Sequence, residues 1–276
     1  MLYVSDLDGT LLNSAGALSA ASRDMLAGLL AGGTRFTVAS ARSVHSILQV
    51  LDGVPLTLPI VELNGAFLTD PATGGHLAVN ALNGAVTHGV YLQIQGAGFL
   101  PFISTFDGAR DNLYHPKPTN DGMQWYYNDR VAVRDPRLRA KKRLEDVLDE
   151  QVICFTVIDR GELLVPLAQK LTGMYGSLIQ LHLFRHLYCP GWSWLTVHDA
   201  HATKANALGA MRKLIGMPEE PLTVFGDDIN DIAMFAHADR AIAVSNALDE
   251  VKQKAHLLIS SNDEDSVARF LQTDNK

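Results

Sequence analysis

The stretch SDLDGTLLNS, residues 5–14, follows directly on a short apolar run at residues 2–4. Aspartate is a poor strand former, and the carboxylates of Asp6 and Asp8 repel each other at the end of a strand. Stability alone gives no reason for this pair. A chemical role has to account for Asp6 and Asp8.

Outward from this stretch, apolar runs of strand length alternate with amphipathic helical segments at both ends of the sequence. Ser19 can cap a helix that Gly32-Gly33 ends, and Ser43 can cap the next one. Strands are predicted over residues 2–4, 34–39, 58–63, 222–225, 241–244 and 257–259. Helices are predicted after Ser19 and over residues 44–51, 203–215, 229–236, 247–254 and 265–271. This alternation predicts an α/β class with a Rossmann-like, doubly wound parallel sheet.

The middle of the chain has a different pattern. Strands adjacent in sequence predict an α+β insert with an antiparallel sheet, at residues 99–105, 152–159 and 178–188, with a helix near 162–171 and an aromatic loop at 125–130. The basic run at residues 134–143 is interpreted as a solvated helix face rather than a polyanion patch. We therefore expect a catalytic core of residues 1–80 and 195–276 and an inserted domain of residues 81–194.

Composition limits the classes of function. The 276 residues are 47% hydrophobic and 19% charged, which is typical of a globular protein, and the length favours two domains. No apolar run has the length of a membrane span and no signal segment precedes Ser5, so a cytoplasmic protein without a membrane partner is expected. A net charge of −7 disfavours nucleic acid. Cys154 and Cys189 are expected to be buried and not to form a disulfide framework.

Polar residues follow each predicted core strand. Because the carboxyl ends of parallel strands meet at one edge of the sheet, these residues are expected there together. They are Asp6, Asp8, Ser40, Arg42, Asn64 and the run GDDIND at residues 226–231. Clustered carboxylates about 4 Å apart repel by about 4 kcal/mol at an effective dielectric near 20, so a cation is needed. All-oxygen ligands favour Mg²⁺, and a metal beside a carboxylate nucleophile indicates phosphoryl transfer.

Five motifs in this order resemble the haloacid dehalogenase-like hydrolase superfamily. They are DLDGT, SAR, LNGA, TKANAL and GDDINDIAMF. The chain is most similar to the Cof-type branch, whose members are magnesium-dependent phosphatases with a large α/β cap. The core resemblance covers roughly residues 1–80 and 195–276, and for the insert it rests on length and pattern only.

The resemblance implies roles for individual residues. Asp6 would be the nucleophile that becomes an aspartyl phosphate, and Asp8 the general acid and then the base, with its backbone carbonyl on the metal. The implied metal set is Asp6, Asp8, Asp227 and Asp231, and Asp231 would also hold the lysine or a metal-bound water. The implied phosphate contacts are Ser40, Lys204 and Asn230, to which Arg42 and Asn64 are added as candidates. Thr10 to Ala17 would form a hairpin flap that closes on the substrate.

Several residues keep a second interpretation. Asp228 can equally be interpreted as a helix cap or as a metal ligand. Asn64 can equally be part of an Asn-Gly turn or a substrate contact. Two departures from the family pattern each lose a glycine, at Ala41 and Ala205. Solvated loop positions are the commoner interpretation of His198 and His201, the alternative being the mouth of the site. His182 and His186 fall on a predicted strand, where residues four apart are about 13 Å distant, which disfavours a metal.

The aromatic and basic residues near the aromatic loop are interpreted as core of the insert rather than as a face that selects substrate. They are Tyr114, His115, Lys117, Trp125, Tyr126 and Tyr127.

The function predicted from these observations is a Mg²⁺-dependent phosphatase. Its substrate would be a small phosphorylated metabolite, a sugar phosphate or similar phosphomonoester, hydrolysed through an aspartyl-phosphate intermediate. A phosphomutase or phosphotransferase on the same core is one alternative. A non-catalytic sensor of phosphate or Mg²⁺ is the other. A monomer or a homodimer is expected.

Overall fold

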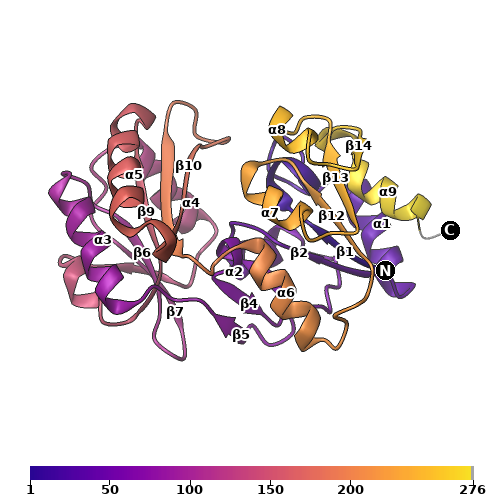
Figure 1. Ribbon diagram of the computed structural model, residues 1–276, viewed down its shortest axis with the longest axis horizontal. Helices are drawn as coiled ribbons and strands as arrows, with labels where there is room; N and C mark the ends of the chain where they lie inside the picture. The colour runs from indigo at the N-terminus through magenta and orange to yellow at the C-terminus, as the bar shows by residue number, and fades with distance from the viewer. Residues whose placement is uncertain (275–276) are drawn as a thin grey trace. The chain divides into compact units, whose positions relative to one another are not determined.

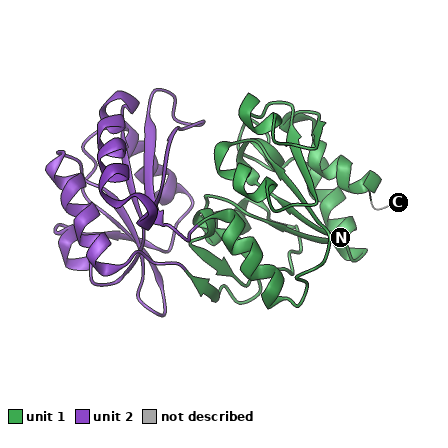
Figure 2. Ribbon diagram, in the orientation of Figure 1, with its two compact units in different colours: residues 1–79, 203–276 green, residues 80–202 purple. Residues whose placement is uncertain are grey.

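The computed structural model describes residues 1–274, and the chain forms two compact units (Figure 2). Unit 1 consists of residues 1–79 and of the chain from residue 203 onward, and unit 2 of residues 80–202. The second unit is thus an insertion in the first. The parallel sheet of unit 1, with helices between its strands, confirms the predicted α/β class.

Unit 1 is built on a five-stranded parallel sheet (Figure 1). Its strand order is β14-β13-β12-β1-β2. The strands are β1 (Leu2–Ser5), β2 (Arg35–Val38), β12 (Leu222–Gly226), β13 (Arg240–Val244) and β14 (Leu257–Ile259). Every pairing between them is parallel, and β1 lies between β2 from the N-terminal part and β12 from the C-terminal part. The N-terminal and C-terminal parts of unit 1 thus meet at the neighbouring strands β1 and β12.

The helices of unit 1 connect these strands and bury the sheet. They are α1 (Ala20–Ala31), α2 (Val44–Val50), α6 (Lys204–Leu214), α7 (Ile232–Phe235), α8 (Asp249–Lys252) and α9 (Ser266–Asp274). Helix α1 packs against α9, and α6 packs against α7. The strands β1, β2, β12 and β13 are buried along nearly their whole length and meet these helices in one core that includes Val4, Phe36 and Phe225.

A small antiparallel sheet extends unit 1 beyond β2. It contains β3 (Ile60–Glu62), β4 (Phe67–Thr69) and β5 (His76–Val79), in that order. A single parallel bridge between Ala39 and Val61 joins it to the end of β2. The predicted third strand therefore follows the parallel sheet only at its edge, because its main partner is the hairpin strand β4.

Unit 2 contains a six-stranded sheet in the order β10-β11-β9-β6-β7-β8. The strands are β6 (Phe102–Phe106), β7 (Asp111–His115), β8 (Leu138–Ala140), β9 (Gln151–Asp159), β10 (Ile179–Arg185) and β11 (Ser193–Asp199). All pairings are antiparallel except that of β7 with β8. Helices α3 (Gly84–Gly96) and α5 (Gly161–Tyr175) pack together over β9, and α4 (Asp121–Ala132) contacts β9 through a separate apolar cluster.

Three sequence predictions about local structure are wrong. The aromatic loop at residues 125–130 is part of helix α4, whose N-cap Asn120 accepts from the Met123 backbone N–H. The basic run is no helix face, since it includes strand β8 and the buried ion pair of Arg137 with Asp135. Residues 10–17 form no β-hairpin: a short turn, η1 (Leu7–Leu11), is followed by a loop closed by the Asn13 N–H on the Ala17 oxygen.

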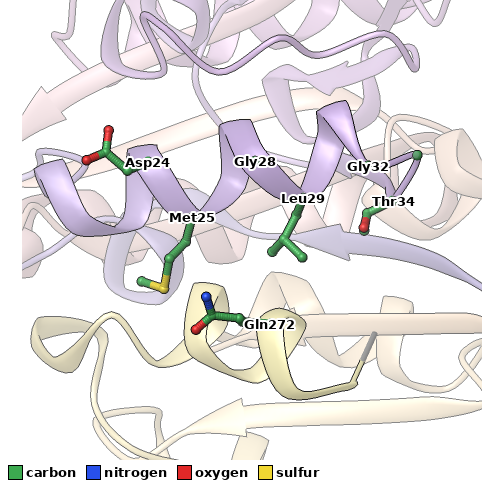
Figure 3. A pocket seen from close by; sticks show the side chains of 8 residues that line it. Asp24, Met25, Gly28, Leu29, Gly32, Thr34 and Gln272 are labelled. Atoms are coloured by element: carbon green, nitrogen blue, oxygen red, sulfur yellow. The ribbon is translucent and has the colours of Figure 1, made fainter. Parts of the chain in front are cut away.

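A surface hollow of about 450 Å³ lies between α1 and α9 (Figure 3). Its lining is formed by Asp24, Met25, Gly28, Leu29, Gly32, Gly33, Thr34 and Gln272. None of the predicted site residues lines it, so it is not the candidate site. No helix within residues 1–274 is long and apolar enough to cross a membrane.

Candidate active site

The predicted site residues of unit 1 come together at the carboxyl edge of the parallel sheet. Asp6 follows β1, Ser40 follows β2, and Asp227 follows β12. Strands β1 and β12 are neighbours that belong to the two different parts of the chain. The crevice at such a switch point is where open α/β sheets bind their ligands.

A buried lysine joins the two acidic motifs. Nζ of Lys204, at the start of α6, lies 2.7 Å from Oδ1 of Asp6 and 2.8 Å from Oδ1 of Asp231. The side chains of Lys204 and Asp231 are fully buried. The other oxygen of Asp231 accepts from the backbone N–H groups of Asp227 and Asp228. Asp231 therefore fixes both the lysine and the backbone of its own motif.

The protonation of this cluster follows from burial and charge. Burial alone would lower the pKa of Lys204, but Asp231 and Asp6 outweigh it and hold the pKa above its ordinary value. Burial raises the pKa of Asp6, Lys204 opposes this, and Asp231 and Asp227 add to it. Burial and the charge of Asp231 raise the pKa of Asp227 to about 7. The single positive charge of Lys204 thus does not neutralise the negative charges of Asp6, Asp227 and Asp231.

Three of these carboxylates are placed to hold a metal ion. One oxygen each from Asp6, Asp227 and Asp231 lies within 4.8 Å of the others. Three carboxylates and one lysine leave a formal charge of −2, which a divalent cation would neutralise. The donors are all oxygen atoms, which fits Mg²⁺ among the hard cations.

Asp8 does not share this acidic group, because its carboxylate is held by Arg42. The guanidinium of Arg42 donates from Nε to Oδ2 of Asp8 at 2.7 Å and from Nη2 to Oδ1 at 2.6 Å. Such a two-bond pair is the most directional ion pair between side chains. The arginine that the sequence offered as a phosphate contact is bound to Asp8 in this structure.

The loops after β2 and β3 are locked to each other through their backbones. The Asn64 N–H donates to the Ser40 carbonyl oxygen at 2.9 Å, and the Leu63 N–H to that of Arg42 at 3.0 Å. Ser40 is buried, and its Oγ accepts from the Arg42 N–H at 3.1 Å. These bonds place Ser40 at the same edge of the sheet as Asp6.

Asn64 connects these loops to the last acidic motif. Its Oδ1 accepts from Nδ2 of Asn230 at 3.0 Å. Within the described chain, Oδ1 of Asn230 is buried and has no hydrogen-bond partner. Gly65 has a φ of +97°, and a Cβ there would lie 2.3 Å from the carbonyl oxygen of Thr203. The Asn-Gly pair is therefore needed for the close approach of the residue that precedes Lys204.

Close packing also explains Gly9 in the first motif. Its φ is +80°, and a Cβ would lie 2.3 Å from Oδ2 of Asp227. Thr10 donates from Oγ1 to Oδ1 of Asp227 at 2.6 Å. Sequence reasoning missed Thr10 as a site residue, although its place in the DLDGT motif was a usable signal. Asp228 caps η5 (Ile229–Asp231), where its Oδ1 accepts from the Ile229 N–H at 2.7 Å, so the cap interpretation is confirmed.

Other predicted candidates lie in unit 2 and do not form a metal site there. His198 is buried, with Nε2 at 3.4 Å from Sγ of Cys154, so it is not a solvated loop residue. Trp125, Tyr126 and Tyr127 pack against an apolar cluster, which agrees with the core interpretation. Cys154 and Cys189 are both buried and free, as expected.

A parallel sheet whose carboxyl edge carries clustered aspartates and a buried lysine has the features of an α/β enzyme. The chain belongs to the haloacid dehalogenase-like hydrolase family, whose model matches residues 3–271. The predicted resemblance to this superfamily and to its Cof-type branch is confirmed.

Curated relatives match along nearly their whole length. The chain is 25% identical over 287 residues to the 5-amino-6-(5-phospho-D-ribitylamino)uracil phosphatase YwtE of Bacillus subtilis, with 96% of this chain and 95% of the relative covered. It is 24% identical over 285 residues to the pyridoxal phosphate phosphatase YbhA of Escherichia coli, again with 96% and 95% covered. With the family match, these relatives confirm the prediction that the chain is a phosphatase-type enzyme.

Solved structures share the fold. A haloacid dehalogenase-like hydrolase from Bacteroides thetaiotaomicron superposes with a TM-score of 0.80 at 23% identity, covering 99% of this chain and 98% of that one. A subclass IIB sugar phosphatase gives a TM-score of 0.78 at 18% identity, with 99% and 98% covered. Both comparisons support the two-unit α/β architecture.

Proposed function

We propose that the protein is a Mg²⁺-dependent phosphatase that hydrolyses a small phosphomonoester through an aspartyl phosphate on Asp6. The observation that carries the proposal is the pairing of Asp6 with Lys204, Asp227 and Asp231 at the sheet edge, with Asp8 two residues after the nucleophile. A nucleophile, a cationic group and a separate acid are the parts that phosphoryl transfer requires.

The two carboxylate oxygens of Asp6 have different roles in the proposed reaction. Lys204 contacts Oδ1 of Asp6, so Oδ2 is assigned to attack on phosphorus. As the Asp6–phosphorus bond forms, the bond from phosphorus to the substrate's alcohol oxygen breaks, and Asp8 gives that oxygen a proton. Water then attacks phosphorus and gives a proton back to Asp8, while the bond from phosphorus to Asp6 breaks.

The remaining residues bind the phosphoryl group and balance its charge. Ser40, Lys204 and Asn230 are assigned to the phosphoryl oxygens, to which Asn230 would donate from Nδ2, the amide nitrogen that also donates to Asn64. Asp6, Asp227 and Asp231, with the Asp8 carbonyl, would hold Mg²⁺. The ion would neutralise the phosphoryl charge during transfer. Arg42 is assigned to holding Asp8 in place rather than to phosphate.

The substrate class proposed is a small phosphorylated metabolite. The two curated relatives are named for a ribityl phosphate and for pyridoxal phosphate, and one structural neighbour for a sugar phosphate. These three compounds share a phosphomonoester on a small polar body. A small-molecule partner follows, and the expected cytoplasmic location and monomeric or dimeric state stay predictions.

The test is phosphate release from a panel of small phosphomonoesters, with Mg²⁺ and with EDTA. Magnesium-dependent release by the wild type that is lost in Asp6→Asn supports the proposal. Asp8→Asn should lose turnover while Mg²⁺ binding, followed by calorimetry, persists. Loss of both in Asp8→Asn would contradict the role given to Asp8.

The alternatives give different results in the same assay. A phosphotransferase would release little phosphate until an acceptor sugar is added, and would then form a new phosphoester. A sensor would bind Mg²⁺ and phosphate without turnover, and it would have no need of Asp8 as an acid. Folded protein that binds Mg²⁺ but is inactive with and without acceptors would favour the sensor.

A further inference from the structure

The turn that carries Asp8 is held by two asparagines from the C-terminal part of unit 1. Asn246 lies between β13 and α8, and its Nδ2 donates to the Gly9 carbonyl oxygen at 2.7 Å. The Asn262 N–H donates to Oδ1 of Asn246 at 3.0 Å, and Nδ2 of Asn262 donates to the Leu12 carbonyl oxygen at 2.8 Å. The segment from Gly9 to Leu12 is thus bound at both ends.

The direction of the Asn246 amide is fixed by chemistry. A backbone N–H can only donate, so the atom of Asn246 that faces Asn262 must be its oxygen. The amide nitrogen then faces Gly9, whose carbonyl can only accept. Neither bond would survive a flip of the amide. Asn262, itself buried, therefore sets the donor that Asn246 presents to the turn.

The hydrogen bond from Asn246 acts on a residue whose backbone would otherwise be unusually free. Glycine has more backbone freedom than any other residue, and here it adopts a φ of +80° directly after Asp8. The Gly9 carbonyl belongs to the Gly9–Thr10 peptide group, so the Asn246 bond fixes that group. The backbone rotation of Gly9, which connects this group to Asp8, is limited by the same contact.

The loop of Asn246 also holds the other side of the site. The Leu248 N–H donates to the backbone oxygen of Asp227 at 3.0 Å. Thr10, next to Gly9, donates to the Asp227 carboxylate. Residues 246–248 therefore contact both strand-end loops that supply the acidic residues.

We propose that Asn246 is a positioning residue for Asp8, which fixes the adjacent Gly9–Thr10 peptide and is oriented by Asn262. Asn246 is exposed, so removing its side chain leaves no cavity and affects the fold little. The effect expected on turnover rests on the proposed function. The effect expected on the turn itself does not, because it is measured on the protein without substrate or metal.

The test compares wild type with Asn246→Ala and Asn246→Asp in the full chain. Hydrogen exchange of the residue 7–12 segment, without metal, should become about tenfold faster in both variants. Turnover of the best phosphomonoester should fall about tenfold to a hundredfold in kcat, as expected for a misplaced acid. KM should stay within about threefold, because binding groups are unchanged. Asn246→Asp keeps the acceptor for Asn262 and removes only the donor.

Asp263→Ala is the matched control. Asp263 accepts from the N–H and Oγ of Ser14, both at 2.7 Å, and so holds the same loop beyond Leu12. It should leave kcat within about twofold and exchange at residues 7–11 unchanged. The proposal is overturned if Asn246→Ala leaves exchange and kcat as in wild type, or if Asn246→Asp behaves normally. A wild type without turnover would defeat the proposed function, and exchange would still decide the role of Asn246.

Discussion

At the scale of single residues, Lys204 is the side chain on which the acidic cluster depends. It is fully buried and contacts Asp6 and Asp231, so it neutralises charge that has no access to water. A buried charge of this kind is costly to leave without its partner, whereas the intact pair adds little net stability. The lysine is retained for the site rather than for the fold.

Lys204→Met is expected to lower the free energy of unfolding by about 3 kcal/mol, because two buried carboxylates lose their cation. Urea unfolding without metal measures the change. Saturating Mg²⁺ should restore part of the stability, since the ion replaces the lost charge. Lys204→Met, Asp231→Asn should be closer to wild type than the single variant. A change below about 1 kcal/mol in Lys204→Met would contradict the assigned charge balance.

His198 gives unit 2 a pH-dependent stability. Burial and the nearby His182 lower the pKa of His198 from 6.5 to about 3 in the folded protein. Below pH 6.5 the unfolded chain binds a proton that the folded chain does not, so stability falls as the pH falls from 6.5 toward 3. Between pH 6.5 and pH 5 the loss from this group should be about 2 kcal/mol.

Urea unfolding of wild type and His198→Gln at a series of pH values checks this expectation. The variant cannot take up the proton, so its stability should fall less steeply between pH 6.5 and pH 5. Equal slopes in the two proteins would show that His198 is protonated in the folded state. Comparison with wild type cancels the contribution of groups that do not interact with His198.

At the scale of elements, most helices and strands of unit 1 begin where the sequence indicates. Helix α1 starts after Ser19, whose Oγ accepts from the Ser22 N–H at 2.9 Å. Helix α2 starts after Ser43, but the Ser43 hydroxyl makes no cap bond. Instead the carboxylate of Glu62, from β3, accepts from the Val44 N–H. Helix α2 is therefore capped by a side chain from another strand, and a local sequence pattern cannot show such a contact.

The two cap serines should therefore differ in their contribution to stability. Ser19→Ala is expected to cost about 1–2 kcal/mol, because α1 loses its cap and Asp265 loses a donor. Ser43→Ala should cost less than about 0.5 kcal/mol, since no cap bond is lost. Urea unfolding of the two variants side by side makes the comparison. Equal costs would mean that both hydroxyls cap their helices in solution.

Elements in unit 2 were harder to predict. The run WYYNDR lacks clear helical periodicity, and α4 is held by the packing of Trp125, Tyr126 and Tyr127 against the sheet. The basic run at residues 134–143 contains Arg137, which donates two side-chain hydrogen bonds to the buried Asp135. Helix α4 depends on packing against distant strands, and the Arg137–Asp135 pair, although local, depends on a burial that the charged run does not indicate. Local propensity is too weak to overrule such contacts.

At the scale of the whole molecule, the boundaries of the inserted unit differ from those predicted from the sequence. The predicted insert ended at residue 194, whereas β11 pairs with β9 and β10, and unit 2 runs from residue 80 to residue 202. Strand β11 was not among the strands predicted from the sequence. Its place in unit 2 depends on pairing with β9 and β10, and such pairing joins strands that a local pattern does not connect.

Residues 80–202 are expected to fold on their own, because the unit has its own sheet and two apolar clusters. The excised fragment should unfold cooperatively, with a midpoint between about 45 and 65 °C. Near-ultraviolet circular dichroism during heating is the measurement. Phe155→Ala, at a fully buried position, should destabilise the fragment by about 3–5 kcal/mol. A gradual transition that ignores this variant would contradict an independent unit.

The sequence by itself determined the α/β class, the positions of most core strands along the chain, and that Asp6, Ser40 and Asp227 directly follow such strands. These follow from local patterns: apolar runs, caps, glycines, and polar residues placed directly after strands. Only the tertiary structure decided that Arg42 binds Asp8, that Glu62 caps α2, and that Asn246 holds Gly9. The reason is physical, since each of these bonds joins atoms that only the folded chain brings within hydrogen-bond distance.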